Sequence, residues 1–349
     1  MLRTRFHRYP KITLFLVVLA GLALILGSGE AVVRLLAPQI NFLDNSTELI
    51  VRNVYQDTHA HAKNARALSF GAEVITDQYG FRANSLPPPP SPGSAMLFLG
   101  DSVTFGPGVT AEETFVELLA KDFPQMRMLN AAVIGYDYDD YRNFVKNFLV
   151  LRKQELGIDY LVLGICLNDI SSVSKSNIQA RILLQTFDPT AVAEWAYRRF
   201  PIINDFLRSR SKLFLLFKSL VFDASSAAFF ADYPFYRNPD NVQRALQELA
   251  EVITVSRQAQ VRLLVVIFPY EFQLRSDNPE YLYPQSVLGK YLVEQGIPTI
   301  DLYGSFLEDK RLSNTGSSVY YLFNDPMHFS VVGHATVRSF LSPWLLKTL

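Results

Sequence analysis

A serine with an aspartate and a histidine much further along the chain carries the clearest chemical signal in this sequence. Ser102 can act as a nucleophile, and His328 can take its proton near neutral pH. Asp325 can orient the imidazole of His328 by accepting its other N–H. A serine activated in this way attacks carbonyl carbons, so these residue types predict acyl transfer through an acyl-serine intermediate.

An acyl-transfer site also needs hydrogen-bond donors for the oxyanion that forms at the attacked carbonyl. The backbone N–H groups of Ser102 and Gly135 and the side-chain amide of Asn168 could supply them. Losing one such donor typically costs about 10²–10³ in rate, so Asn168 is expected to matter nearly as much as the triad. Asp101 is expected to brace the loop rather than act as the base, and His334 is expected to be structural.

The elements that must position these residues alternate along the chain. Five buried strands are predicted from apolar runs at residues 96–99, 126–133, 160–167, 261–268 and 298–301. Amphipathic patterns predict helices at residues 112–123, 139–156, 239–258, 283–295 and 331–346. Strands that alternate with helices pair in parallel through right-handed crossovers. We therefore predict a three-layer α/β/α, flavodoxin-like fold with the polar residues at the carboxyl edge of its sheet.

Residues 171–238 interrupt this alternation and are rich in aromatic side chains. We interpret them as an insertion at the carboxyl edge of the sheet, with a helical piece at residues 212–222. The insertion could form a cap that shapes a substrate site, or its helices could pack their apolar faces on the main domain, and the sequence does not decide between these two. A role at a membrane surface is a weaker third interpretation.

An apolar run at residues 12–26 follows a basic flank that contains Arg3, Arg5, Arg8 and Lys11. About 18 uncharged residues in a row come close to the ~20 that a membrane-spanning helix needs. The basic flank predicts a cytoplasmic N-terminus and a single span, with the rest of the chain outside the inner membrane. A cleaved signal peptide is the alternative, but the Glu30/Arg34 pair continues the helical pattern and favours an uncleaved anchor.

The chain is accordingly predicted to have three parts. Residues 1–36 form the flank and the transmembrane anchor, and residues 37–95 form a juxtamembrane segment that ends in a stiff, proline-rich linker. Residues 96–349 form the catalytic domain with its insertion. Residues 37–70 show no pattern that predicts regular structure.

Composition excludes several other classes of protein. The formal net charge is zero and no basic stripe occurs, which speaks against binding of nucleic acid. Cys166 is the single cysteine, so an intrachain disulfide and a cysteine-based zinc site are excluded, and a buried, inert thiol is predicted. His59 and His61 have no acidic or cysteine partner nearby and are interpreted as solvent-exposed side chains. Neither a metal nor a cofactor is predicted.

These motifs, in this order, resemble the conserved blocks of the SGNH hydrolases, also called GDSL esterases and lipases. The matching residues are Gly100-Asp101-Ser102, Gly135, Gly164 with Asn168-Asp169, and Asp325-Pro326-Met327-His328. The resemblance covers about residues 96–346. The third block departs from the family pattern because Gly164 lies four residues before Asn168 rather than two, which leaves the role of that glycine open. The α/β-hydrolase elbow, Gly-x-Ser-x-Gly, is not matched, because Thr104 stands where its second glycine would be.

The membrane anchor, the Glu30-to-Arg34 segment and Tyr79-Gly80-Phe81-Arg82 also look similar to membrane-anchored bacterial members of this family, which are associated with cell-envelope polysaccharides. That resemblance implies a serine esterase or O-acyltransferase acting on O-acyl groups, chiefly O-acetyl, of an envelope or exported carbohydrate. It also implies a periplasmic catalytic domain and polysaccharide machinery as a partner. A lipase or thioesterase that acts on a lipid or small ester is one alternative. A catalytically silent carbohydrate-binding or assembly protein is the other.

Overall fold

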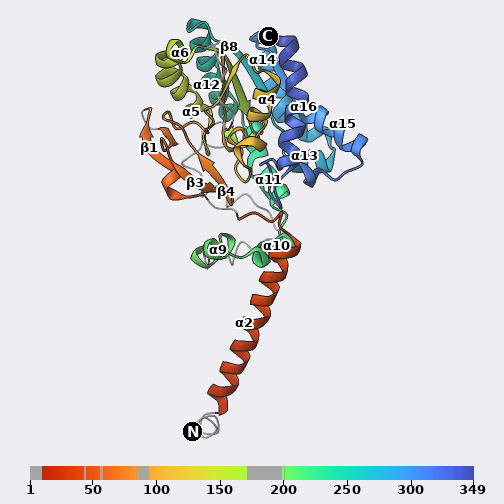
Figure 1. Cartoon of the computed structure of the whole chain (residues 1–349). Coiled ribbons are helices and arrows are strands. Elements are labelled where there is room, and N and C mark those ends of the chain that lie inside the picture. The colour runs from red at the N-terminus through yellow and green to blue at the C-terminus, as the bar shows by residue number, and fades with distance from the viewer. Residues whose placement is uncertain are drawn as a thin grey trace. The chain divides into compact units, whose positions relative to one another are not determined.

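The computed structural model describes residues 10–42, 45–55, 58–83, 85, 94–170, 199 and 201–349 (Figure 1). The chain divides into two compact units. The smaller unit comprises Met1–Phe42 with Pro189–Phe222, and the larger unit comprises Leu43–Asp188 with Asp223–Leu349. Most of the proline-rich linker and residues 171–198 of the predicted insertion lie outside the described residues.

A parallel sheet of five strands forms the centre of the larger unit. Its strands in chain order are β5 (Ala95–Leu99), β6 (Arg127–Asn130), β7 (Ile158–Ile165), β8 (Arg262–Ile267) and β9 (Thr299–Asp301). They lie side by side in the order β6-β5-β7-β8-β9, and every adjacent pair is parallel. This is the doubly wound, flavodoxin-like order, so the predicted fold class is confirmed. All residues of β5 are buried, because a strand covered on both faces has no solvent side.

Helices cover both faces of this sheet (Figure 1). On one face α4 (Phe115–Asp122) packs beside α16 (Val331–Thr348). On the other face α5 (Tyr138–Phe144) packs beside α12 (Pro239–Gln258), and α14 (Tyr283–Glu294) contacts β9. The ends of these helices follow from local sequence. The Asn238 side chain, for example, accepts hydrogen bonds from the first backbone N–H groups of α12.

The helix predicted over residues 139–156 has three parts. A π-helical turn, η3 (Val145–Leu149), separates α5 from α6 (Val150–Leu156). Hydrophobic spacing does not predict such a turn, because it changes only the local hydrogen-bond pattern. The remaining elements of the larger unit outside its N-terminal segment are α3 (Ser102–Phe105), α11 (Ala224–Arg237), α13 (Glu271–Ser276), α15 (Tyr303–Ser313) and the 3₁₀ turns η2 (Ala111–Glu113), η5 (Pro279–Leu282) and η6 (Ser317–Tyr320).

Among the described residues of the predicted insertion, helix α11 belongs to the larger unit. Its Phe229 side chain is fully buried among aromatic rings that include Phe272 and Tyr281. For this helix, packing of an apolar face on the main domain is therefore the correct interpretation.

Two β-hairpins occupy the segment for which the sequence predicts no regular structure. After the 3₁₀ turn η1 (Thr47–Leu49), β1 (Ile50–Val54) pairs with β2 (Thr58–His61), and β3 (Arg66–Ser69) pairs with β4 (Ala72–Ile75). The strands are only four or five residues long, and a two-residue loop joins β3 to β4. Both loop residues, Phe70 and Gly71, have positive φ, as a type I′ turn requires. Phenylalanine is an unusual residue for this conformation, which explains why the hairpin is hard to predict.

The smaller unit is built on α2 (Pro10–Leu36), with α9 (Pro201–Arg208) and α10 (Lys212–Val221). The Glu30 carboxylate accepts hydrogen bonds from the backbone N–H groups of Lys212 and Leu213, at 3.0 and 2.9 Å, and so caps α10. Among the described residues, α2 is the one helix that is by itself long and apolar enough to cross a membrane. Helices α10 and α11 pass the same test only when they are counted together.

Candidate active site

The end of strand β5 presents the Ser102 hydroxyl at the carboxyl edge of the sheet. Asp101 is the N-cap of the short helix α3, and its Oδ1 accepts a hydrogen bond from Val103 N at 2.9 Å. This cap turns the chain sharply, so that Ser102 is the first residue of the helix. Ser102 is 8% exposed, so the residue is buried but not completely enclosed.

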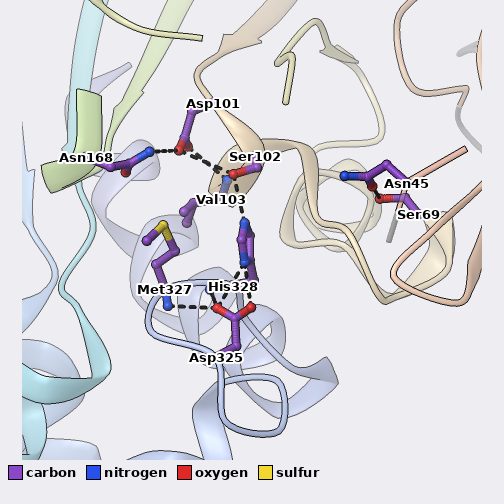
Figure 2. Close-up of polar contacts among 9 residues, drawn as sticks. All are labelled: Asn45, Ser69, Asp101, Ser102, Val103, Asn168, Asp325, Met327 and His328. Carbon is purple, nitrogen blue, oxygen red and sulfur yellow. Dashed lines mark hydrogen bonds and ion pairs between the residues drawn. The ribbon is translucent and has the colours of Figure 1, made fainter. Parts of the chain in front are cut away.

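Ser102, His328 and Asp325 form one continuous chain of hydrogen bonds (Figure 2). The Nε2 atom of His328 lies 2.8 Å from Ser102 Oγ, and its Nδ1 atom lies 2.8 Å from Asp325 Oδ2. Backbone N–H groups of Met327 and His328 donate to Asp325 Oδ1 at 2.9 and 2.8 Å and hold the carboxylate in place. The carboxylate in turn selects the tautomer with its proton on Nδ1, so Nε2 is ready to accept the serine proton.

The electrostatic surroundings favour His328 as a base. Burial alone would lower the pKa of His328, but the charge and hydrogen bond of Asp325, with the charge of Asp101, outweigh burial and raise that pKa above its ordinary value. A raised pKa makes the imidazole a stronger proton acceptor. The same carboxylates would stabilise an imidazolium at His328.

Asp101 links Ser102 to Asn168. The Asn168 amide donates to Asp101 Oδ2 at 3.1 Å, and this oxygen lies 3.4 Å from Ser102 Oγ. The serine proton therefore points to His328, whose nitrogen is 0.6 Å nearer. Burial raises the pKa of Asp101, and the hydrogen bonds from Asn168 and Val103 N together with the charge of His328 offset this rise only in part. Figure 2 shows this carboxylate between the amide and the serine, which agrees with a bracing role rather than that of the base.

Gly135 lies at the exit of β6, next to the exit of β5. Val133 N donates to Gly100 O at 3.0 Å, which brings the turn after β6 beside the Asp101-Ser102 corner. Gly135 has φ +82° and an exposed backbone. The structure therefore connects Ser102, Asn168, Asp325 and His328 by hydrogen bonds, either directly or through Asp101, and places Gly135 on the neighbouring strand exit.

The two histidines of β2 are not solvent-exposed side chains, and the sequence-based interpretation was wrong. His61 is 2% exposed, and both imidazoles contact the backbone of Ile134, next to Gly135. Burial and the nearby charges of His59 and Arg82 lower the pKa of His61 to about 3, so it is neutral. The contacts of His59 and His61 with Ile134 join residues more than 70 positions apart, so no local sequence pattern predicts them. Among the described residues, no cluster of His, Cys, Asp and Glu suits a metal ion.

Gly164 has a packing role that its sequence spacing leaves open. A Cβ at Gly164 would collide with Thr104 Oγ1 and would lie 2.7 Å from a ring carbon of Phe268. A Cβ at Gly100 would collide with the same threonine. Gly100, directly after β5, and Gly164, on the adjacent strand β7, thus make room for Thr104, which seats α3 against the sheet.

The structural roles predicted for His334 and Cys166 agree with the structure. His334 is fully buried in α16, where its Nδ1 accepts from Phe115 N at 3.3 Å and burial lowers its pKa to about 3. Cys166 is a free, fully buried thiol, and burial raises its pKa far above the ordinary value.

Two further side chains near the nucleophile were not predicted. The ring of Phe70, at the tip of the β3–β4 hairpin, contacts the His328 imidazole edge-on at 5.1 Å between centroids. The buried guanidinium of Arg82 donates to Phe105 O, at the end of α3, and to Gly106 O and Val109 O in the loop after it. Both residues come from the segment before the proline-rich linker, and only the tertiary fold brings them to the site.

No protein-family model and no curated protein matches the chain. Among solved structures, it is similar to a member of the lipolytic protein G-D-S-L family from Veillonella parvula, with 16% identity and TM-score 0.41 over 71% of this chain and 95% of the other. It is also similar to a catalytic mutant of Axe2, an acetylxylan esterase from Geobacillus stearothermophilus, with 13% identity and TM-score 0.43 over 72% and 94%. A two-domain esterase active on acetylated mannans aligns with 14% identity and TM-score 0.41 over 73% of this chain and 50% of the other.

Proposed function

We propose that the chain is a membrane-anchored serine hydrolase or acyltransferase of the SGNH type that removes or transfers O-acyl groups, chiefly acetyl, on a cell-envelope or exported carbohydrate. One observation carries the proposal: the unbroken line of hydrogen bonds from Ser102 through His328 to Asp325, with Asn168 held beside the serine by Asp101. A serine that only capped a helix would not need this arrangement.

The first half of the reaction forms an acyl-enzyme. Ser102 Oγ attacks the ester carbonyl carbon as its proton moves to His328 Nε2. The backbone N–H groups of Ser102 and Gly135 and the Asn168 amide are the proposed donors to the oxyanion. The carbonyl then re-forms, the ester C–O bond breaks, and the departing alcohol takes the proton from His328.

The second half releases the acyl group. A water molecule or a sugar hydroxyl gives its proton to His328 and attacks the acyl carbon. The bond to Ser102 Oγ breaks, and the serine recovers the proton from the imidazole. Water yields the free acid and a sugar hydroxyl yields a new ester, so the same residues serve hydrolysis and transfer.

The anchor is proposed to remain attached to the mature protein. Glu30 and Arg34 form an ion pair at 2.6 Å, and Glu30 caps α10 from a separate part of the chain. A helix that serves as a structural partner for α10 is better explained as a permanent element than as a signal peptide. We propose a single-pass inner-membrane protein with its catalytic unit outside the cytoplasm. A C-terminal reporter active only in the cytoplasm should stay silent, and activity of that reporter would overturn this topology.

A serine-directed phosphonate ester tests the enzyme hypothesis. The full chain in detergent should gain one phosphonyl adduct on Ser102, seen by peptide mass spectrometry, and hydrolyse an aryl acetate. Ser102→Ala should show neither result, whereas Ser85→Ala, outside the proposed catalytic site, should behave like the wild type. Absence of labelling in the wild-type protein, with a known esterase labelled in parallel, would favour the silent carbohydrate-binding alternative.

The substrate class is tested with competing acyl donors. An O-acetylated polysaccharide should be deacetylated faster than a long-chain aryl ester or an acyl thioester. Free acetate and acetyl groups on an added oligosaccharide, measured together, separate hydrolysis from transfer. Preference for the long-chain ester or the thioester would instead favour the lipase or thioesterase alternative.

A further inference from the structure

Two histidines of β2 hold the backbone of the residue that precedes Gly135. His59 Nε2 lies 2.7 Å from Ile134 O, and because a carbonyl oxygen can only accept, the imidazole is the donor. Ile134 N donates to His61 Nε2 at 3.3 Å. Residues two apart on a strand face the same side, which is how both imidazoles reach one residue.

Ile134 and Gly135 are the central residues of a tight turn. Tyr136 N donates to Val133 O at 3.1 Å and closes the turn, and Gly135 has φ +82°. A positive φ at the third residue is characteristic of a type II turn. Type I and type II turns differ by a flip of the central peptide. That peptide consists of the Ile134 carbonyl and the Gly135 N–H, so fixing one group fixes the direction of the other.

We propose that His59 is a positioning residue that holds the Ile134–Gly135 peptide in the orientation in which the Gly135 N–H faces the oxyanion. The inference rests on the proposed function, because Gly135 acts as a donor only if Ser102 forms an oxyanion. In a trans peptide the C=O and the N–H point in opposite directions. His59 occupies the carbonyl side, so the N–H is directed away from β2.

Two features support this role for His59 over simple packing. A hydrogen bond to the carbonyl polarises the peptide and makes its N–H a stronger donor, by about 10–30%. The His59 ring also contacts the ring of Tyr136 edge-on, at 5.3 Å between centroids, so the imidazole is held at the turn from a second direction. His61 fixes the other side of Ile134.

Two substitutions separate the hydrogen bond from the ring. His59→Phe keeps a ring against Tyr136 but cannot donate, and His59→Gln keeps an amide donor without the ring. In the full chain, His59→Phe should lower kcat for an aryl acetate at least tenfold. The decrease should not exceed about 10²–10³, which is the effect of removing one oxyanion donor completely. KM should stay within about threefold, because the oxyanion exists only after attack. His59→Gln should recover most of kcat. Arg66→Gln, an exposed position in the same segment, is the matched control.

A spectroscopic measurement tests the peptide itself. Ile134-Gly135 is the only Ile-Gly pair in the sequence, so labelling isoleucine with ¹³C at the carbonyl and glycine with ¹⁵N selects one amide signal. The carbonyl shift of Ile134 should move in His59→Phe and return toward the wild-type value in His59→Gln. An unchanged shift in His59→Phe, or unchanged kcat in an active enzyme, overturns the inference. If the wild-type protein itself has no esterase activity, the proposed function fails, and the shift alone still decides whether His59 holds the peptide.

Discussion

Replacing Asp101 by asparagine should separate activity from stability more clearly than any other change at the site. The carboxylate accepts hydrogen bonds from Val103 N at 2.9 Å and from the Asn168 amide at 3.1 Å. Asparagine has one oxygen and one NH₂ group, so one of these two contacts must be lost. Because Val103 lies in the helix that Asp101 caps, we expect the oxygen to remain there and the NH₂ group to face Asn168.

Two donors would then face each other, and Asn168 would lose the partner that orients it. Misplacing one oxyanion donor costs about 10²–10³ in kcat, or about 2.7–4 kcal/mol of transition-state stabilisation. The stability of the fold should change little. At neutral pH the buried carboxylate carries a desolvation cost, seen in its raised pKa, and the neutral amide removes that cost while it loses one hydrogen bond. We therefore expect a melting temperature within a few degrees of the wild-type value.

The assay compares kcat for an aryl acetate with thermal unfolding in the same buffer. Asp159→Asn, an exposed aspartate on β7, is the matched control and should change neither quantity. If Asp101→Asn kept kcat within threefold of the wild type, Asp101 would not position the Asn168 amide. If the variant were inactive only because it unfolded, thermal unfolding would reveal it.

Further predictions concern His328, Gly164 and Phe70. Because His328 acts as a base only when neutral and its pKa is raised, kcat/KM should fall as pH drops through a midpoint above 6.5. Asp325→Asn should move that midpoint to lower pH and reduce kcat steeply, by about 10⁴ in serine proteases, and an unmoved midpoint would contradict the assigned pair. Gly164→Ala should destabilise the fold by about 1–3 kcal/mol through overpacking, and Thr104→Ala should relieve part of that loss in a thermal melt. Phe70→Ala should lower kcat/KM by about 2- to 13-fold, the value of one aromatic contact of 0.5–1.5 kcal/mol, and an unchanged kcat/KM would show that the ring does not support His328.

The sheet and the residues at its edge could be predicted because their signals are local. A buried parallel strand is apolar along its whole length, as β5 and β8 are, and strand ends in a doubly wound fold meet at one edge. The pairing of Ser102 with His328 spans more than 200 residues, yet the order of the strands together with the residue types made it predictable.

The side chains that surround Ser102 and His328 could not be predicted in the same way. His59, Phe70 and Arg82 act through contacts with backbone or ring atoms that lie far away in sequence. Their own segment has short strands and a turn with phenylalanine in the left-handed region. Neither an alternation of apolar and polar residues nor typical turn residues therefore predicted a hairpin. Gly164 was identified as part of a motif, but its role depends on the position of Thr104 in helix α3, 60 residues earlier in the chain.

The contacts of Arg82 have a practical consequence for producing this protein. Its three carbonyl acceptors come after the proline-rich linker in the sequence, at the last residue of α3 and in the loop that follows this helix. A soluble fragment that began at Ser94, after the linker, would lack Arg82 and both β-hairpins. The smallest fragment expected to fold and work should instead begin before Ile50. A chain cut by a protease between Ser85 and Ser94 should stay together as a non-covalent complex of its two pieces, and adding the shorter piece should restore activity to the longer one.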